Sequence, residues 1–179
     1  MTANDSDYED ACKAYEAENY DKAYELFYAL ALESDVSCQV NVANMLMHGL
    51  GVEQNEDRAF EWYEQAALNE DKVAQYIYGW YCIHQGDEEE GLKQVTLASD
   101  ALYLDALYDL ASFYAQGLYT CPKDLVKASD LYEKAIGLGK KEAIGRLFLI
   151  KKEFLGLFQS LIYFAKNISS FAGSISSKT

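Results

Sequence analysis

Residues 49–67 read GLGVEQNEDRAFEWYEQAA, and this stretch indicates how the whole chain folds. Two glycines two residues apart suit positions that need a positive φ directly after a helix ends. Asn55 is a suitable N-cap for a following helix, because its side chain can accept a hydrogen bond from the first turn. The apolar residues of that helix share one face, at i, i+3, i+4, i+7 and i+8: Ala59, Trp62, Tyr63, Ala66 and Ala67. Small residues beside large ones on this face predict that another helix packs closely against it.

The same pattern recurs along the chain. The small residues that anchor such helices are Ala23, Ala59, Gly91 and Ala128. The helices of the other kind alternate with these along the chain and are anchored on Cys38, Ala74, Ala106 and Ala143. Both series are spaced by 36, 32 and 37 residues. Two series that agree step for step indicate an internal repeat whose unit is a helical hairpin.

Within residues 1–152 we expect an array of four hairpins and one further first helix. The hairpins span about 8–32, 37–68, 72–100 and 105–137, and the further first helix spans 140–152. Residues 153–179 are expected to form a separate apolar, slightly basic helix with a tail that frays from Ser169.

The repeated unit resembles the Sel-one-like repeat, a relative of the tetratricopeptide repeat. The unit at 37–68 matches the pattern best, at Ala43, Leu46, Gly49, Gly51, Val52, Ala59, Trp62, Tyr63, Ala66 and Ala67. The resemblance implies an all-α fold, a right-handed α/α superhelix (solenoid) of stacked hairpins whose first helices line a concave face. It also implies an adaptor that holds another protein, and it does not name that protein.

Charge and cysteine usage narrow the function further. The formal net charge of −14 argues against binding nucleic acid, whose phosphates require Lys and Arg, and favours a partner with a basic surface. The four cysteines include no C-x-x-C pair, so the sequence predicts no zinc or redox site and reduced thiols at packing positions. The N-terminal stretch MTANDSDYED lacks the features of a signal peptide, and we expect a cytoplasmic protein.

The sequence contains no motif for catalysis or cofactor binding. There is no phosphate-binding glycine loop, no G-x-S-x-G and no H-E-x-x-H, so we expect no enzyme activity and no cofactor. His48 and His84 occupy the same register in adjacent units, ten residues after their anchors. Further ligands at suitable spacing are missing, and we therefore expect no metal site.

Tetratricopeptide geometry suggests which residues line the concave face. Counted from the anchor of each first helix, the positions are −1, +2, +6, +9 and +10. The predicted partner-binding residues are Asn44, Met47, His48, Tyr76, Trp80, Ile83, His84, Tyr108, Ser112 and Gln116. Aromatic, Met and His side chains gathered in a groove are typical of a protein-binding surface. The alternative is that Tyr76 and Trp80 pack between helices.

The C-terminal stretch differs from the repeats in charge. From Gly145 to Thr179 the net charge is +4, so residues 1–144 carry −18. An apolar stripe is expected at Phe154, Phe158, Leu161, Ala165 and Ile168, widened by Leu157, Phe164 and Phe171. This segment is interpreted as a capping helix that closes the array. The alternatives are that it folds back into the acidic groove, that it receives a partner, or that it lies on a membrane surface. Its polar interruptions disfavour a membrane-spanning helix.

The sequence therefore favours a non-enzymatic protein–protein interaction scaffold that binds a peptide or a basic protein surface. One alternative is an immunity or inhibitor protein that neutralises a toxic effector. Another is a membrane-peripheral assembly factor that uses the C-terminal helix, and we consider a membrane surface the less favoured partner. We expect a monomer or a weak dimer.

Overall fold

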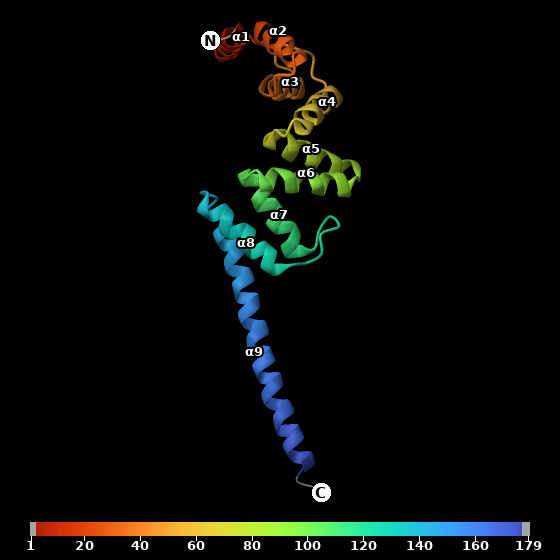
Figure 1. Ribbon diagram of the computed structural model, residues 1–179, viewed down its shortest axis with the longest axis vertical. Helices are drawn as coiled ribbons and strands as arrows, with labels where there is room; N and C mark the ends of the chain where they lie inside the picture. The colour runs from red at the N-terminus through yellow and green to blue at the C-terminus, as the bar shows by residue number, and fades with distance from the viewer. Residues whose placement is uncertain (1–2, 177–179) are drawn as a thin grey trace.

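The computed structural model describes the backbone of residues 3–176 and the side chains of residues 6–159 and of Leu161. Over residues 3–176 the chain forms nine helices and no strand (Figure 1). The helices are α1 (Ala3–Glu16), α2 (Tyr20–Leu32), α3 (Val36–His48), α4 (Glu56–Leu68), α5 (Lys72–Gln85), α6 (Glu88–Asp100), α7 (Leu104–Gln116), α8 (Leu125–Gly137) and α9 (Ala143–Ser176). The prediction of an all-α fold is confirmed.

Helices adjacent in sequence pack against each other along the whole array. The pairs α1–α2, α3–α4, α5–α6 and α7–α8 are hairpins, and each hairpin packs on the next through α2–α3, α4–α5 and α6–α7. The hairpins stack into an elongated superhelix, and α9 leads away from its last hairpin (Figure 1). Helices α3 to α8 begin and end at, or next to, the residues expected from the sequence.

The loop that opens the 49–67 stretch is held by its two glycines. Gly49 ends α3 in the left-handed conformation with φ 66°, and Asn55 caps α4 by accepting a hydrogen bond from the Arg58 backbone N–H at 2.9 Å. Gly51 also has a positive φ of 67°. A Cβ atom there would lie 2.1 Å from the carbonyl oxygen of Tyr20, at the start of α2. Gly51 is therefore needed both for its backbone conformation and for close contact with the preceding hairpin.

Small residues bring the two helices of each hairpin close together. The anchors Ala59 and Ala128 are fully buried, and the neighbouring Tyr63 and Tyr132 fill the space beside them. In the hairpin α5–α6, a Cβ atom on Gly91 would lie 2.6 Å from the backbone oxygen of Gly79. The backbones of α5 and α6 therefore touch where the other hairpins use alanine.

The C-terminal region differs from the expected division at residue 152. Helices α3, α5 and α7 each end at a glycine in the left-handed conformation, namely Gly49, Gly86 and Gly117. These glycines follow their anchors by 11 or 12 residues, and α9 has Phe154 and Leu155 at those distances, so the helix has no stop there and continues to Ser176. Residues 153–176 are thus part of α9 and do not form a separate helix. The expected fraying from Ser169 is not seen as far as Ser176, and residues 177–179 lie outside the described residues.

The cysteines lie among the packed helices. Cys38, Cys82 and Cys121 are buried free thiols, and Cys12 is half-buried. Burial raises the pKa of the Cys38, Cys82 and Cys121 thiols, so they stay protonated and act as packing residues. Among the described helices, none combines the length and the apolar character that crossing a bilayer requires.

Candidate functional site

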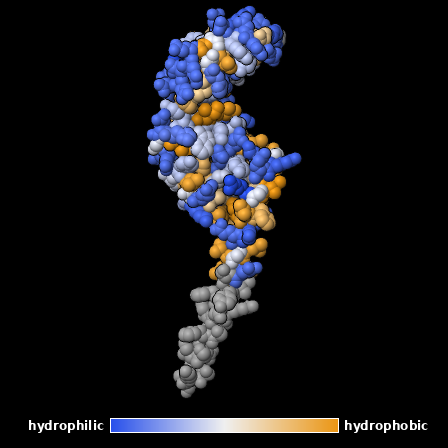
Figure 2. All heavy atoms as spheres, turned by 180° about the vertical axis from the view of Figure 1, so that it is seen from behind, coloured by the Kyte–Doolittle hydropathy of each residue, from blue (hydrophilic) through white to orange (hydrophobic). Residues whose placement is uncertain are grey.

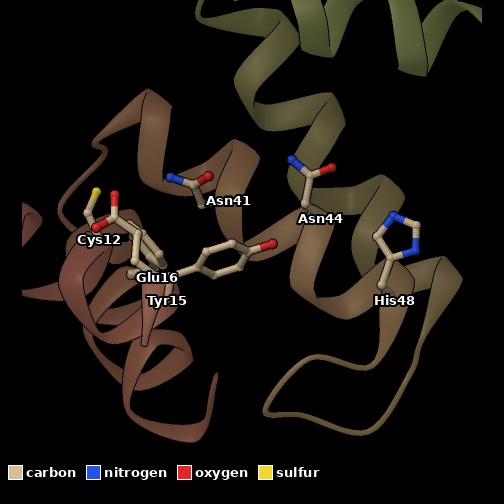
Figure 3. A pocket seen from close by; sticks show the side chains of 7 residues that line it. Cys12, Tyr15, Glu16, Asn41, Asn44 and His48 are labelled. Carbon is tan, nitrogen blue, oxygen red and sulfur yellow. The ribbon is translucent and has the colours of Figure 1, made fainter. Parts of the chain in front are cut away.

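The first predicted group lines a pocket between α1 and α3. Asn44 and His48 face Tyr15 and Glu16 of α1 across a cavity of about 370 Å³ (Figure 3). The ring of Tyr15 points from α1 toward α3 in this view. Asn44 is also tied to its own hairpin, since its side-chain oxygen accepts a hydrogen bond from the Tyr63 hydroxyl at 2.7 Å. The pocket therefore has a fixed polar wall on the α3 side.

Tyr76 and Trp80 of α5 meet at a carboxylate of the next first helix. The Tyr76 hydroxyl donates to Oδ2 of Asp109 at 2.8 Å, and the Trp80 indole N–H donates to the same oxygen at 3.1 Å. All three side chains are half-buried. Tyr76 and Trp80 thus connect α5 to α7, as the alternative interpretation expected, while their remaining surface is exposed.

The surroundings of Asp109 shift the pKa of its carboxyl group. Burial raises the pKa of this carboxyl above its usual value, and the hydrogen bonds from Tyr76 and Trp80 lower it in part. Within the described residues, none of the ion pairs involves Asp109. The charge of Lys140 lowers the pKa of Asp109, but Lys140 is itself paired with Asp105. Asp109 is therefore a partly desolvated carboxylate with neutral hydrogen-bond donors.

The other predicted residues of this region divide between surface and core. The exposed imidazole of His84 stacks on the ring of Trp80, with centroids 5.7 Å apart. Ile83 is only 8% exposed and packs in the core against Gly91, so its side chain does not reach the surface. Ile83, the residue at offset +9 in α5, faces α6 because Gly91 lets α6 approach α5 closely. Met47, at the same offset in α3, is half-buried against the N-terminal core.

The third group lies on α7 beside α9. The Ser112 and Tyr132 hydroxyls are 2.8 Å apart, and the Tyr108 hydroxyl accepts a hydrogen bond from Nε of Arg146 at 3.4 Å. Gln116 is exposed and lines a cavity of about 150 Å³ that also includes Arg146. These contacts extend the surface from α5 across α7 to α9.

We call the resulting face the first-helix surface. It consists of Asn44, His48, Tyr76, Trp80, His84, Tyr108, Asp109, Ser112 and Gln116. Sequence reasoning missed Asp109, along with the pocket residue Asn41 and the α9 residue Arg146. All three stand at offset +3 from their anchors, which lies outside the offsets taken from tetratricopeptide geometry. Polar residues at +3 in three units were the signal in the sequence.

Among the described residues, no group of three or more His, Cys, Asp or Glu side chains could hold a metal ion. His48 and His84 lie in different parts of the first-helix surface. His48 lines the α1–α3 pocket, and His84 stacks on Trp80.

Solved structures with the same architecture share little sequence identity with this chain. A Sel1 repeat protein from Oxalobacter formigenes is 22% identical, with a TM-score of 0.70, over 78% of this chain and 58% of its own. The protective antigen c5321 of uropathogenic Escherichia coli, which has an SLR fold, is 23% identical with a TM-score of 0.66, over 75% of this chain and 30% of its own. MamA is 18% identical with a TM-score of 0.51, over 86% of this chain and 85% of its own. These neighbours show the fold alone, and this chain spans little more than half of the first and under a third of the second.

No curated protein matches the sequence significantly. The Sel1 repeat profile, however, matches residues 36–71, 72–103 and 104–140. These segments are 36, 32 and 37 residues long, which are the three intervals predicted from the two anchor series. The predicted resemblance is thereby confirmed. The chain belongs to the Sel1 repeat family.

Proposed function

We propose that this protein is a scaffold without enzyme activity that binds a partner protein through the first-helix surface, and that the partner places a basic side chain next to Asp109. Sel1 repeat proteins are generally non-enzymatic scaffolds for protein interaction. The observation that carries the proposal is the Asp109 carboxylate, which is half-buried and, among the described residues, receives its side-chain hydrogen bonds from the neutral Tyr76 and Trp80.

A partly buried carboxylate without a cation is costly, because hydrogen bonds replace only part of its hydration. A lysine or arginine from a partner offsets this cost by pairing with Asp109 as the site loses water. Residues 1–144 carry a charge of −18, which attracts and orients a basic partner over a longer range.

The α1–α3 pocket supports a second region of contact. The side-chain amides of Asn41 and Asn44 offer both donors and acceptors, which suit the backbone of an extended peptide. Glu16 adds a further negative charge at the rim of this pocket. The proposed partner segment therefore combines a basic residue with a stretch of exposed backbone.

The test uses an array of short peptides in which a single Lys or Arg is moved through an apolar sequence. The wild-type protein is expected to select peptides by the position of the basic residue. With a selected peptide, Asp109→Asn is expected to weaken binding about tenfold or more by fluorescence anisotropy, because a hydrogen bond to a charged group contributes roughly 1.5–3 kcal/mol.

Asp130→Asn is the matched control. Asp130 is exposed on α8, and its substitution changes the net charge by the same amount. Equal binding by the two variants would show that only the overall charge matters. Binding that ignores the basic residue of the peptide would remove Asp109 from the site altogether.

A further inference from the structure

The apolar face by which α9 packs on the array continues beyond the array. Ala143 and Ile150 are buried, at 0% and 5% exposure. Phe154, Leu157 and Leu161 lie on the same side of the helix, since they follow at spacings of three and four residues. Their exposed fractions are 38%, 53% and 67%. The side of α9 that begins as a core contact thus becomes an exposed apolar surface.

Phe148 shows that an ordinary second helix of the repeat does not cover this part of α9. It stands at offset +5, where the complete units have Ala43, Gly79 and Ala111. Gly79 at this offset contacts its own second helix so closely that a Cβ atom would lie 2.9 Å from Val95. In α9 the position holds a phenylalanine that is 67% exposed. A helix approaching as closely as α6 approaches α5 would collide with this ring.

The exposed residues enclose a hollow. Phe154, Leu155, Phe158 and the side chain of Lys151 surround an apolar depression of about 530 Å³. Figure 2 shows apolar residues gathered where α9 leaves the array. A depression framed by side chains of one helix is the shape that receives a side chain from another helix. We define the α9 surface as Phe154, Leu155, Leu157, Phe158 and Leu161.

We propose that the α9 surface binds the α9 surface of a second copy of this chain, as an antiparallel helix pair. A two-fold axis pairs each patch with itself, and an apolar patch is complementary to its own copy. At roughly 100 Å² of exposed area per large side chain, the five residues supply about 500 Å² per copy. The two copies together bury about 1,000 Å², which is the smallest area expected of a specific interface.

Charge selects the antiparallel orientation. Each copy carries −18 on residues 1–144, and a parallel pair would bring the two acidic arrays side by side. In an antiparallel pair centred on the α9 surface, Ile150 of one copy stands opposite residue 165 of the other, so the two arrays end roughly 22 Å apart along the helix axis. That separation exceeds the Debye length of about 8 Å at physiological ionic strength. The same acidic array repels an anionic membrane, which disfavours lipid as the occupant of this surface.

The test compares Phe158→Glu with Leu149→Glu in the full-length chain. Phe158 belongs to the α9 surface and is 62% exposed, whereas Leu149 is 56% exposed and lies nine residues earlier, on the opposite side of the helix. In sedimentation velocity over a wide concentration range, the wild type and Leu149→Glu are expected to dimerise alike. Phe158→Glu is expected to raise the dimer dissociation constant about 100-fold, because it buries an unpaired charge.

Two further measurements complete the test. Small-angle scattering of the dimer should show an elongated particle with two separated lobes. Circular dichroism checks that each variant keeps its helices, and Leu155→Glu replaces Phe158→Glu if the latter loses them. A wild type that stays monomeric at every concentration overturns the proposal, as does equal loss of dimer in Leu149→Glu. A monomer that floats with vesicles of phosphatidylcholine and phosphatidylserine overturns it in favour of lipid.

Discussion

The indole N–H of Trp80 lies 3.1 Å from Oδ2 of Asp109 and joins the first helix of one repeat to the first helix of the next. Tyr76, one turn earlier, donates to the same oxygen at 2.8 Å. The hairpin with the shortest connector is therefore linked to its neighbour by two side-chain hydrogen bonds to one carboxylate.

The other two complete units place this bond inside the hairpin. At offset +6 of the first helix, Asn44 bonds to Tyr63, and Ser112 bonds to Tyr132. In the unit α5–α6, Val95 stands where these units have a tyrosine. Val95 offers no hydroxyl, so the residue at +6, Trp80, bonds outward to Asp109.

Removing the indole N–H tests the strength of this link. Trp80→Phe is expected to lower the free energy of unfolding by about 1–3 kcal/mol, because the bond is made to a partly buried charged group. Trp62→Phe is the control, since Trp62 contacts Tyr28 through its ring at a centroid distance of 5.8 Å. Urea unfolding measures both. A Trp80→Phe variant no less stable than Trp62→Phe would show that the hydrogen bond contributes nothing beyond ring packing.

The raised pKa of Asp109 predicts a specific dependence of stability on pH. Because burial makes the folded protein hold this proton more tightly than the unfolded chain does, the free energy of unfolding contributed by Asp109 falls as pH rises from about 3.9, the usual Asp value, through the raised pKa. Asp109→Asn keeps an acceptor oxygen for Tyr76 and Trp80 but cannot titrate.

Urea midpoints of wild type and Asp109→Asn, taken from about pH 4 to pH 7, measure this difference. The variant is expected to gain stability relative to the wild type as pH rises. Asp130→Asn, on the exposed side of α8, should leave the profile unchanged. A difference between wild type and Asp109→Asn that stays constant with pH would mean that burial does not perturb this carboxyl.

Gly51→Ala tests the contact between consecutive hairpins. The new Cβ atom would lie 2.1 Å from the Tyr20 carbonyl oxygen at a φ of 67°, so the loop or α2 must move. We expect a loss of about 3 kcal/mol or more, of which roughly 1–2 kcal/mol comes from the left-handed backbone alone. Gly86→Ala isolates that backbone part, because its φ is 90° and the space around it is open. Thermal unfolding compares the two, and equal losses would contradict the role of the Tyr20 contact.

Most of the scaffold could be predicted because its signals are local. The caps at Gly49 and Asn55 depend on the conformation and hydrogen bonds of a few consecutive residues. Hydrophobic periodicity placed helices α3 to α8, and their anchors placed the repeat boundaries that the Sel1 profile matches. The end of α9 was misplaced because the glycine that stops the other first helices is absent at Phe154, and an absent stop is harder to recognise than a present one.

The surface residues were predicted less well because their roles depend on neighbouring hairpins. Ile83 turned inward because Gly91 allows α6 to approach α5 more closely than the offsets of another repeat class assume. Asp109 was missed because nothing in its own helix indicates that Tyr76 and Trp80, about 30 residues earlier, donate to it.

The sequence by itself determined the helices, their caps, the repeat length and the excess of negative charge, because each of these arises from short-range hydrogen bonding, hydrophobic period or composition. Only the tertiary structure decided which side chains face outward, that Asp109 lies between two neutral donors, and that the apolar face of α9 extends past its last neighbour. Those features depend on how closely each hairpin packs on the next, and that distance is set by contacts between residues far apart in the chain, such as Gly51 and Tyr20.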